Sequence, residues 1–94
     1  MPKYYSFLIA DHYLYFTSFC IVEAMHVHAS DKELSEAGSA KFFVRADGSS
    51  KLEKRGDLKD NQITIIQKFI KENYVEMYQK WKNFGGGDFY HSEN

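Results

Sequence analysis

The sequence predicts an α+β domain in which an antiparallel sheet of four or five strands packs on one long C-terminal helix. Two observations predict this class. Segments rich in Tyr, Phe, Leu and Val alternate with short polar turns up to Arg55, and a helical period follows from Asn61 until the three glycines at 85–87. The 94-residue chain suits one domain, which we expect to span residues 1–87, with residues 88–94 as a mobile tail.

A hairpin is expected near the N-terminus. Residues 3–9 and 13–16 are dense in Tyr, Phe, Leu and Ile, and the polar residues between them suit a tight turn. With Asp11 and His12 as a two-residue loop, aromatic and aliphatic side chains pair across the two strands. The pairs that this loop predicts are Ile9 with Leu14, Leu8 with Tyr15, and Phe7 with Phe16.

The next strand is predicted at Met25–Ala29, where Met, Val and Ala alternate with His26 and His28. This is the period of a half-buried strand, and it places both imidazoles on the same face. The preceding segment, 17–25, is apolar without a clean period and stays open between strand and loop. The polar residues 30–38 predict a solvated loop.

A second hairpin is predicted around Asp47-Gly48, because this dipeptide favours a type I′ turn. Its strands are expected at 39–45 and 49–55. Neither face of the hairpin is purely apolar, so the second of these strands is expected near an edge of the sheet. The predicted pairs are Phe43 with Leu52 and Lys41 with Lys54 on one face, and Phe42 with Glu53 and Val44 with Lys51 on the other.

The C-terminal helix is predicted from Asn61 to about Phe84, with Asp60 or Asn61 as its N-cap. Seven large side chains fall on one stripe at the helical period. Burying them at roughly 1.5 to 3 kcal/mol each makes docking of the helix on the sheet the dominant stabilising event. The stripe consists of Ile63, Ile66, Ile70, Tyr74, Met77, Trp81 and Phe84.

Composition narrows the compartment and the ligands. The formal net charge of −1 argues against a protein that binds nucleic acid over its whole surface. The single cysteine, Cys20, has no partner for an intrachain disulfide, so nothing requires an oxidising compartment. No signal peptide is evident, and no apolar run approaches the roughly 18 residues of a membrane span. We therefore expect a cytoplasmic protein with no membrane contact and no cofactor.

The charge is unevenly distributed along the chain. Residues 39–59 carry six basic side chains against three acidic ones, whereas residues 1–38 carry two against five. A basic hairpin with aromatic rings can bind single-stranded nucleic acid through phosphate contacts and stacking, or dock on an acidic partner. Lysines that merely protect a sheet edge are the plainer interpretation. The candidate binding residues are Lys41, Phe43, Arg45, Lys54 and Arg55.

His26 and His28 are the main candidates for chemistry. Two imidazoles side by side on a strand could act as general acid and base in cleaving an RNA phosphodiester. A metal site needs further ligands, and none of the conceivable ones lies at a recognised zinc spacing, so no metal ligand is assigned. In the third interpretation, this strand face meets solvent, a neighbouring strand or a partner protein through imidazole hydrogen bonds. The conceivable further ligands are His12, Cys20, Glu23 and Asp31.

The order of these segments resembles a known family. Its most distinctive pieces are the His-Val-His strand at Met25–Ala29 and the tryptophan that closes Met77–Trp81, joined by Ala40–Val44 and Leu52–Gly56. Over roughly residues 3–86 the chain resembles the small bacterial family catalogued as domain of unknown function 4160. The resemblance implies no established activity. Family members are often encoded beside another small protein, and this arrangement implies a toxin–antitoxin pairing.

The residues and the resemblance together predict a non-enzymatic interaction module of the toxin–antitoxin type, which binds a second small protein encoded nearby. The family usually carries a polar pair and a proline ahead of its two histidines, whereas this chain has Ile21, Val22 and Ala24, which argues against catalysis. Two alternatives stay open: an RNA-cleaving toxin that uses His26 and His28, and a metal-binding domain. The sequence does not distinguish a monomer from a homo-oligomer.

Overall fold

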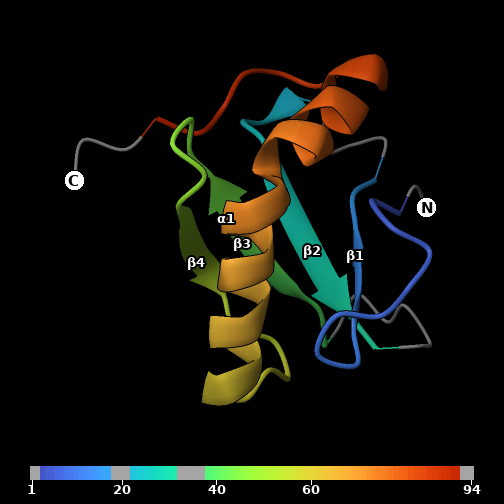
Figure 1. Ribbon diagram of the computed structural model, residues 1–94, viewed down its shortest axis with the longest axis vertical. Coiled ribbons are helices and arrows are strands. Elements are labelled where there is room, and N and C mark those ends of the chain that lie inside the picture. The colour runs from blue at the N-terminus through green and yellow to red at the C-terminus, as the bar shows by residue number, and fades with distance from the viewer. Residues whose placement is uncertain (1–2, 18–21, 32–37, 92–94) are drawn as a thin grey trace.

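The computed structural model describes residues 3–17, 22–31 and 38–91. Within them, four antiparallel strands form one sheet in the order β1-β2-β3-β4, and one helix lies across one of its faces (Figure 1). The α+β class, with a four-stranded sheet and a single C-terminal helix, is therefore confirmed. The elements are β1 (Tyr13–Tyr15), β2 (His26–Ser30), β3 (Ala40–Val44), β4 (Ser50–Lys54) and α1 (Asp60–Asn83).

The core lies between the sheet and the helix. Alternate strand residues such as Val27 and Phe42 are fully buried and form one cluster with the apolar stripe of α1. The opposite face includes His28, Lys41 and Phe43 and is not covered by α1, except that His26 at the start of β2 contacts the Trp81 ring. We call it the helix-free face. The buried residues of the helix are Ile63, Ile66, Ile70, Met77 and Trp81.

The first turn forms one residue earlier than predicted. Ala10 and Asp11 both have positive φ, 50° and 63°. Ile9 and His12 exchange both backbone hydrogen bonds, at 2.8 and 2.9 Å. The loop is therefore Ala10-Asp11, with the left-handed backbone of a type I′ turn. The ring of His12 supports a turn that has no glycine, because its Nδ1–H donates to the Ala10 carbonyl at 2.6 Å.

The strand pairing predicted for this hairpin is also wrong. Lys3 rather than Leu8 pairs with Tyr15, and the Tyr4 backbone N donates to the Leu14 carbonyl at 2.8 Å. Within the described residues, the N-terminal arm forms only isolated bridges, so β1 is an edge strand. The pairs that do not form are Ile9 with Leu14, Leu8 with Tyr15, and Phe7 with Phe16.

The second hairpin has the predicted strands but a different turn. Arg45 N donates to Ser49 O at 2.9 Å, and Gly48 N donates to Arg45 O at 2.9 Å, which closes a three-residue loop. Gly48 has a φ of 87°, whereas Asp47 has a negative φ, so a type I turn followed by a left-handed glycine replaces the predicted type I′ turn. Asp47 Oδ1 favours this form by accepting hydrogen bonds from the backbone N and the hydroxyl of Ser49, at 2.9 and 2.6 Å.

The longer loop changes the register of β3 against β4. The extra loop residue shifts the pairing next to the turn by one position, so Phe43 faces Lys51. A bulge between Lys41 and Phe42 absorbs this shift, and the predicted pair of Lys41 with Lys54 is confirmed. The shift turns Leu52 into the core and leaves Lys51 on the helix-free face. The edge position predicted for this strand is confirmed. The predicted pairs that do not form are Phe43 with Leu52, Phe42 with Glu53, and Val44 with Lys51.

The ends of α1 differ slightly from the prediction. Neither Asp60 nor Asn61 is the N-cap, because both lie inside the helix; the cap position is Lys59. The Lys59 backbone N donates to the Gln62 side-chain oxygen at 2.9 Å, so a side chain of the helix itself satisfies the N–H of the cap residue. The expected burial of Phe84 is wrong: it follows the last helical residue and is 52% exposed.

After the helix, the chain returns to the sheet. Met25 N donates to Asp88 O at 2.9 Å, and Tyr90 N donates to Val44 O at 2.8 Å. Figure 1 shows this segment, in red, leaving the end of α1 and crossing above the sheet. The described part of the expected tail is therefore hydrogen-bonded to β3 and to the residue before β2.

Some expectations fall on residues that the structure does not describe. In the open segment 17–25, residues 18–21 lie outside the described residues, and so do residues 32–37 of the predicted loop. Within the described residues, no helix is both long enough and apolar enough to cross a membrane.

Replacing Trp81 by alanine is expected to lower the free energy of unfolding by about 3 to 5 kcal/mol, because its fully buried ring would leave a large cavity. Phe84→Ala is the matched control, since that ring is 52% exposed, and it should cost about 1 kcal/mol or less. Urea unfolding followed by circular dichroism measures both values. Equal losses for the two variants would contradict this account of the core.

Candidate functional site

The two histidines lie on one side of β2, as the strand period predicts. Their ring centroids are 5.0 Å apart with an edge-to-face geometry. His26 is 1% exposed, and its Nδ1–H donates to the Ala24 carbonyl at 2.8 Å. Glu23 lies beside it, with its carboxylate 3.6 Å from His26 Nδ1 and 2.7 Å from the ammonium of Lys41. One imidazole is thus buried and held in place, while His28 is partly exposed.

Burial lowers the pKa of both imidazoles. For His28, burial and the neighbouring His26 lower the pKa to about 4. For His26 the pKa is also lowered, chiefly by burial. Both rings are therefore neutral near pH 7. Acid–base cleavage of RNA needs one of them protonated at that pH, so the arrangement favours packing or binding over catalysis.

Aromatic rings and cations gather beside the histidines on the helix-free face. Phe43 and Tyr90 stack with ring centroids 4.4 Å apart. The Lys41 ammonium lies 4.8 Å from the Phe43 centroid. Arg45 and Lys51 lie 5.9 and 5.7 Å from the Tyr90 centroid. We call these five residues the ring–cation cluster. Cation–π contacts hold its cations near the ring faces, and their positive charges remain available to attract anions.

A hollow of about 240 Å³ opens on the helix-free face next to this cluster. His28, which lines the hollow, pairs across the strands with Lys41. Lys54 also lines it and pairs with Lys41 from the other side. Hollow and cluster therefore form one continuous surface. The lining residues are Tyr15, Thr17, His28, Ser39 and Lys54.

The structure brings together four of the five predicted binding residues. Lys41, Phe43 and Arg45 belong to the ring–cation cluster, and Lys54 lines the hollow. Arg55 does not join them, because its guanidinium bonds to Asp60 at 2.7 Å at the start of α1. Its role in this structure is to tie the end of β4 to the helix.

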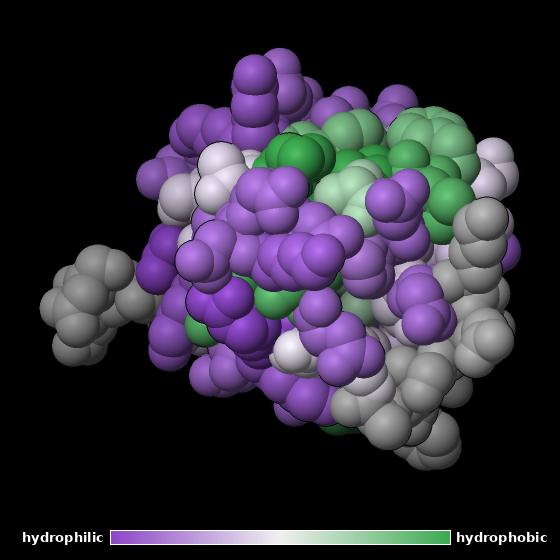
Figure 2. Space-filling view, turned by 90° about the horizontal axis from the view of Figure 1, so that it is seen from below, coloured by the Kyte–Doolittle hydropathy of each residue, from purple (hydrophilic) through white to green (hydrophobic). Residues whose placement is uncertain are grey.

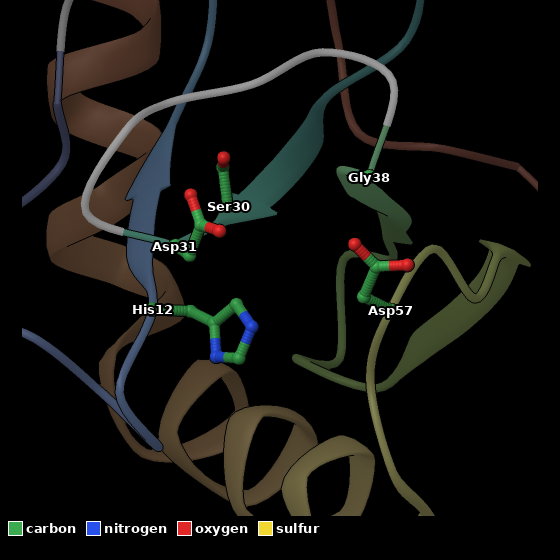
Figure 3. A pocket seen from close by; sticks show the side chains of 5 residues that line it. All are labelled: His12, Ser30, Asp31, Gly38 and Asp57. Atoms are coloured by element: carbon green, nitrogen blue, oxygen red, sulfur yellow. The ribbon is translucent and has the colours of Figure 1, made fainter.

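A second pocket, shown in Figure 3, lies at the other end of β2. The imidazole of His12 and the carboxylates of Asp31 and Asp57 face it from three different segments. Its volume of about 20 Å³ is close to that of one water molecule. It has no room for a nucleotide or a metabolite.

The sequence also contains residues that could serve as metal ligands beside His26 and His28. Within the residues that the structure describes, no three His, Cys, Asp or Glu side chains lie close enough together to hold a metal ion. Cys20, one of the conceivable ligands, lies outside those residues.

An exposed apolar patch lies away from the helix-free face. Figure 2 shows hydrophobic side chains gathered on one part of the molecule seen from below, within a largely hydrophilic surface. Phe7 and Ile65 are 53% and 46% exposed. The rings of Tyr5, Phe7 and Phe69 contact one another, and the Tyr5 hydroxyl donates to Glu76 at 2.5 Å. These contacts tie the N-terminal arm to α1, so we interpret the patch as structural.

Sequence reasoning missed two members of the cluster. Tyr90 lies in the expected tail, and Lys51 was placed on the opposite face of the hairpin. A signal for Tyr90 was present: two adjacent rings, Phe89 and Tyr90, stand in an otherwise polar C-terminal segment. Nothing in the sequence marked the extra loop residue that brings Lys51 to this face.

Fold and site together define a small α+β domain whose sheet has a helix on one face and a basic, aromatic surface on the other. A scan against protein families matches residues 12–82 to the domain of unknown function (DUF4160), and the chain belongs to this family. The resemblance seen in the sequence is thereby confirmed. No curated protein and no solved structure matched the chain.

The lowered pKa of His28 predicts a loss of stability in mild acid. The His28 imidazole binds a proton near pH 6.5 in the unfolded chain, but only near pH 4 in the folded chain. The free energy of unfolding that neutral His28 contributes is therefore complete above pH 6.5 and decreases as the pH falls from 6.5 to 4. We expect the free energy of unfolding of His28→Gln to fall by roughly 1 to 2 kcal/mol less in acid than that of the wild type. This value is reduced for the solvent that screens the partly exposed ring.

Urea unfolding of both proteins at pH 7.5 and pH 4.5 measures the difference. Parallel pH dependence in the wild type and the variant would contradict the lowered pKa. The imidazole signals in an NMR titration give a direct check, because the His28 signal should move only below about pH 5.

Proposed function

We propose that this chain is a non-enzymatic binding module of the toxin–antitoxin type, which acts in the bacterial cytoplasm and binds a second small protein encoded nearby. The observation that supports it is the helix-free face. There the ring–cation cluster and the hollow form one surface that is not packed against the helix. A surface with partly exposed rings at its centre and cations around them is typical of a protein interface.

The cations of this surface indicate an acidic partner. Lys51 and Lys54 are exposed, and Arg45 lies beside Tyr90. Among the carboxylates of the described residues, one pairs with a cation of this surface, namely Glu23 with Lys41. The remaining positive charge would steer an acidic surface to the face and set its orientation.

The histidines support binding rather than catalysis. His26 is buried against Trp81, with ring centroids 5.4 Å apart, and its Nδ1–H donates to the Ala24 carbonyl. His28 stacks on Tyr15 with centroids 5.3 Å apart. Both imidazoles thus shape the surface, and neither carries the charge that a general acid needs at neutral pH.

Co-expression with the product of the adjacent gene, followed by gel filtration, tests the proposal. We expect the two proteins to elute together. Reversing two exposed charges on the face, Lys51→Glu with Lys54→Glu, should weaken the complex about ten-fold or more, because each lost ion pair becomes a repulsion.

The matched control reverses two exposed lysines of the helical side, Lys59→Glu with Lys82→Glu, and should leave co-elution unchanged. The double variants carry the same net charge, so the comparison separates the face from overall electrostatics. Elution of the wild-type chain without a partner, or equal binding by both double variants, would contradict the proposal.

A second candidate is single-stranded RNA, which the same rings and cations favour. Bases can stack on partly exposed rings while Lys41, Arg45 and Lys51 contact phosphates. Fluorescence anisotropy with a labelled single-stranded oligonucleotide tests this function. Binding that weakens steeply with salt and is lost in Tyr90→Ala would support it, and binding unaffected by that substitution would exclude the cluster as the RNA site.

A further inference from the structure

The outer edge of β4 is open. Ser50 and Leu52 face β3 at positions between its hydrogen-bonded pairs, so their backbone N–H and C=O groups point away from the sheet. The Ser50 carbonyl accepts a hydrogen bond from the Gln67 side chain at 3.4 Å. Among the described residues, no hydrogen bond is found to the Ser50 N–H or to the backbone N–H and C=O of Leu52 on this outer side. Such an edge is a template for pairing with another strand.

A groove lies beside the start of this edge, between the first residues of β4 and α1. Its volume is about 360 Å³, and it holds several hydroxyl and amide groups. The hydroxyl oxygen of Ser50 is buried and has no hydrogen-bond partner among the described residues, which leaves one polar group in the groove unsatisfied. The lining residues are Ser49, Ser50, Thr64, Gln67, Lys68 and Lys71.

The charges around the edge select the occupant. Lys68 and Lys71 line the groove on the helix side, and Lys51 and Lys54 project from β4 on the opposite side. Only Glu53 contributes a negative charge from the strand itself. An acidic strand would pair with cations on both of its faces, whereas a second copy of this chain would bring two sets of lysines together.

We propose that the open edge of β4 is a strand-addition site, at which an extended acidic peptide segment of a protein partner joins the sheet as a fifth strand. Backbone hydrogen bonds to Ser50 and Leu52 supply affinity, and side chains that point into the groove supply specificity. This site is separate from the helix-free face and does not depend on the function proposed for that face.

A synthetic ten-residue peptide of alternating glutamate and threonine tests the site, with ¹⁵N-labelled full-length protein observed by NMR. We expect the amide signals of Ser50 and Leu52 to shift and their hydrogen exchange to slow. The same peptide with lysine in place of glutamate should not bind. A glutamate–threonine peptide with alternate N-methylated residues should also fail, because it cannot complete the backbone ladder.

Charge reversal on the protein gives the matched pair of variants. Lys68→Glu, in the groove, should weaken peptide binding about five-fold, while Lys3→Glu, an exposed lysine on β1's side of the sheet, should leave it unchanged. Both lysines are exposed, so both variants should fold.

Three results would overturn the proposal. The acidic peptide could leave the Ser50 and Leu52 amides unchanged, or the N-methylated peptide could bind as well as the unmodified one. In the third, the same amides shift with protein concentration in the absence of peptide, which would assign the edge to a second copy of this chain.

Discussion

The burial of one indole ring holds the parts of this molecule together. Trp81 is fully buried near the end of α1, where its ring contacts Phe16 after β1 and His26 at the start of β2, with centroids 5.5 and 5.4 Å away. Its Nε1–H donates to the Gly87 carbonyl at 2.7 Å. Gly86 packs on the ring so closely that a side chain there would overlap it. Sheet, helix and C-terminal segment therefore meet at a single side chain.

This arrangement links the core to the surface that we propose for binding. Because the chain turns back after α1 and packs on the Trp81 ring, the segment that follows can hydrogen-bond to the ends of the sheet. It thereby places Tyr90 against Phe43. Tyr90 in turn lies near Arg45 and Lys51. The helix stabilises one face of the sheet, and the returning segment organises the other. The position of Tyr90 on the helix-free face thus depends on the packing of the C-terminal segment against Trp81 of the helix.

The sequence predicted what depends on local periodicity. The helix, the strand at β2, the shared side of its two histidines and the edge position of β4 all follow from patterns of period 3.6 or 2. Register was harder, because the turn at Asp47-Gly48 holds one more residue than a type I′ turn, and a single-residue shift exchanges the two faces of a strand. The docking of Tyr90 depends on tertiary contacts that no local pattern encodes.

We propose that this chain binds its partner at the helix-free face, with Tyr90 docked on it. Hydrogen exchange of the free and the partner-bound protein, resolved by mass spectrometry, tests it most directly. The account predicts slower exchange on binding in β3, β4 and residues 88–90, with little change along the exposed side of α1 around Val75. Protection confined to the outer side of α1, with β3 and β4 unchanged, would contradict it.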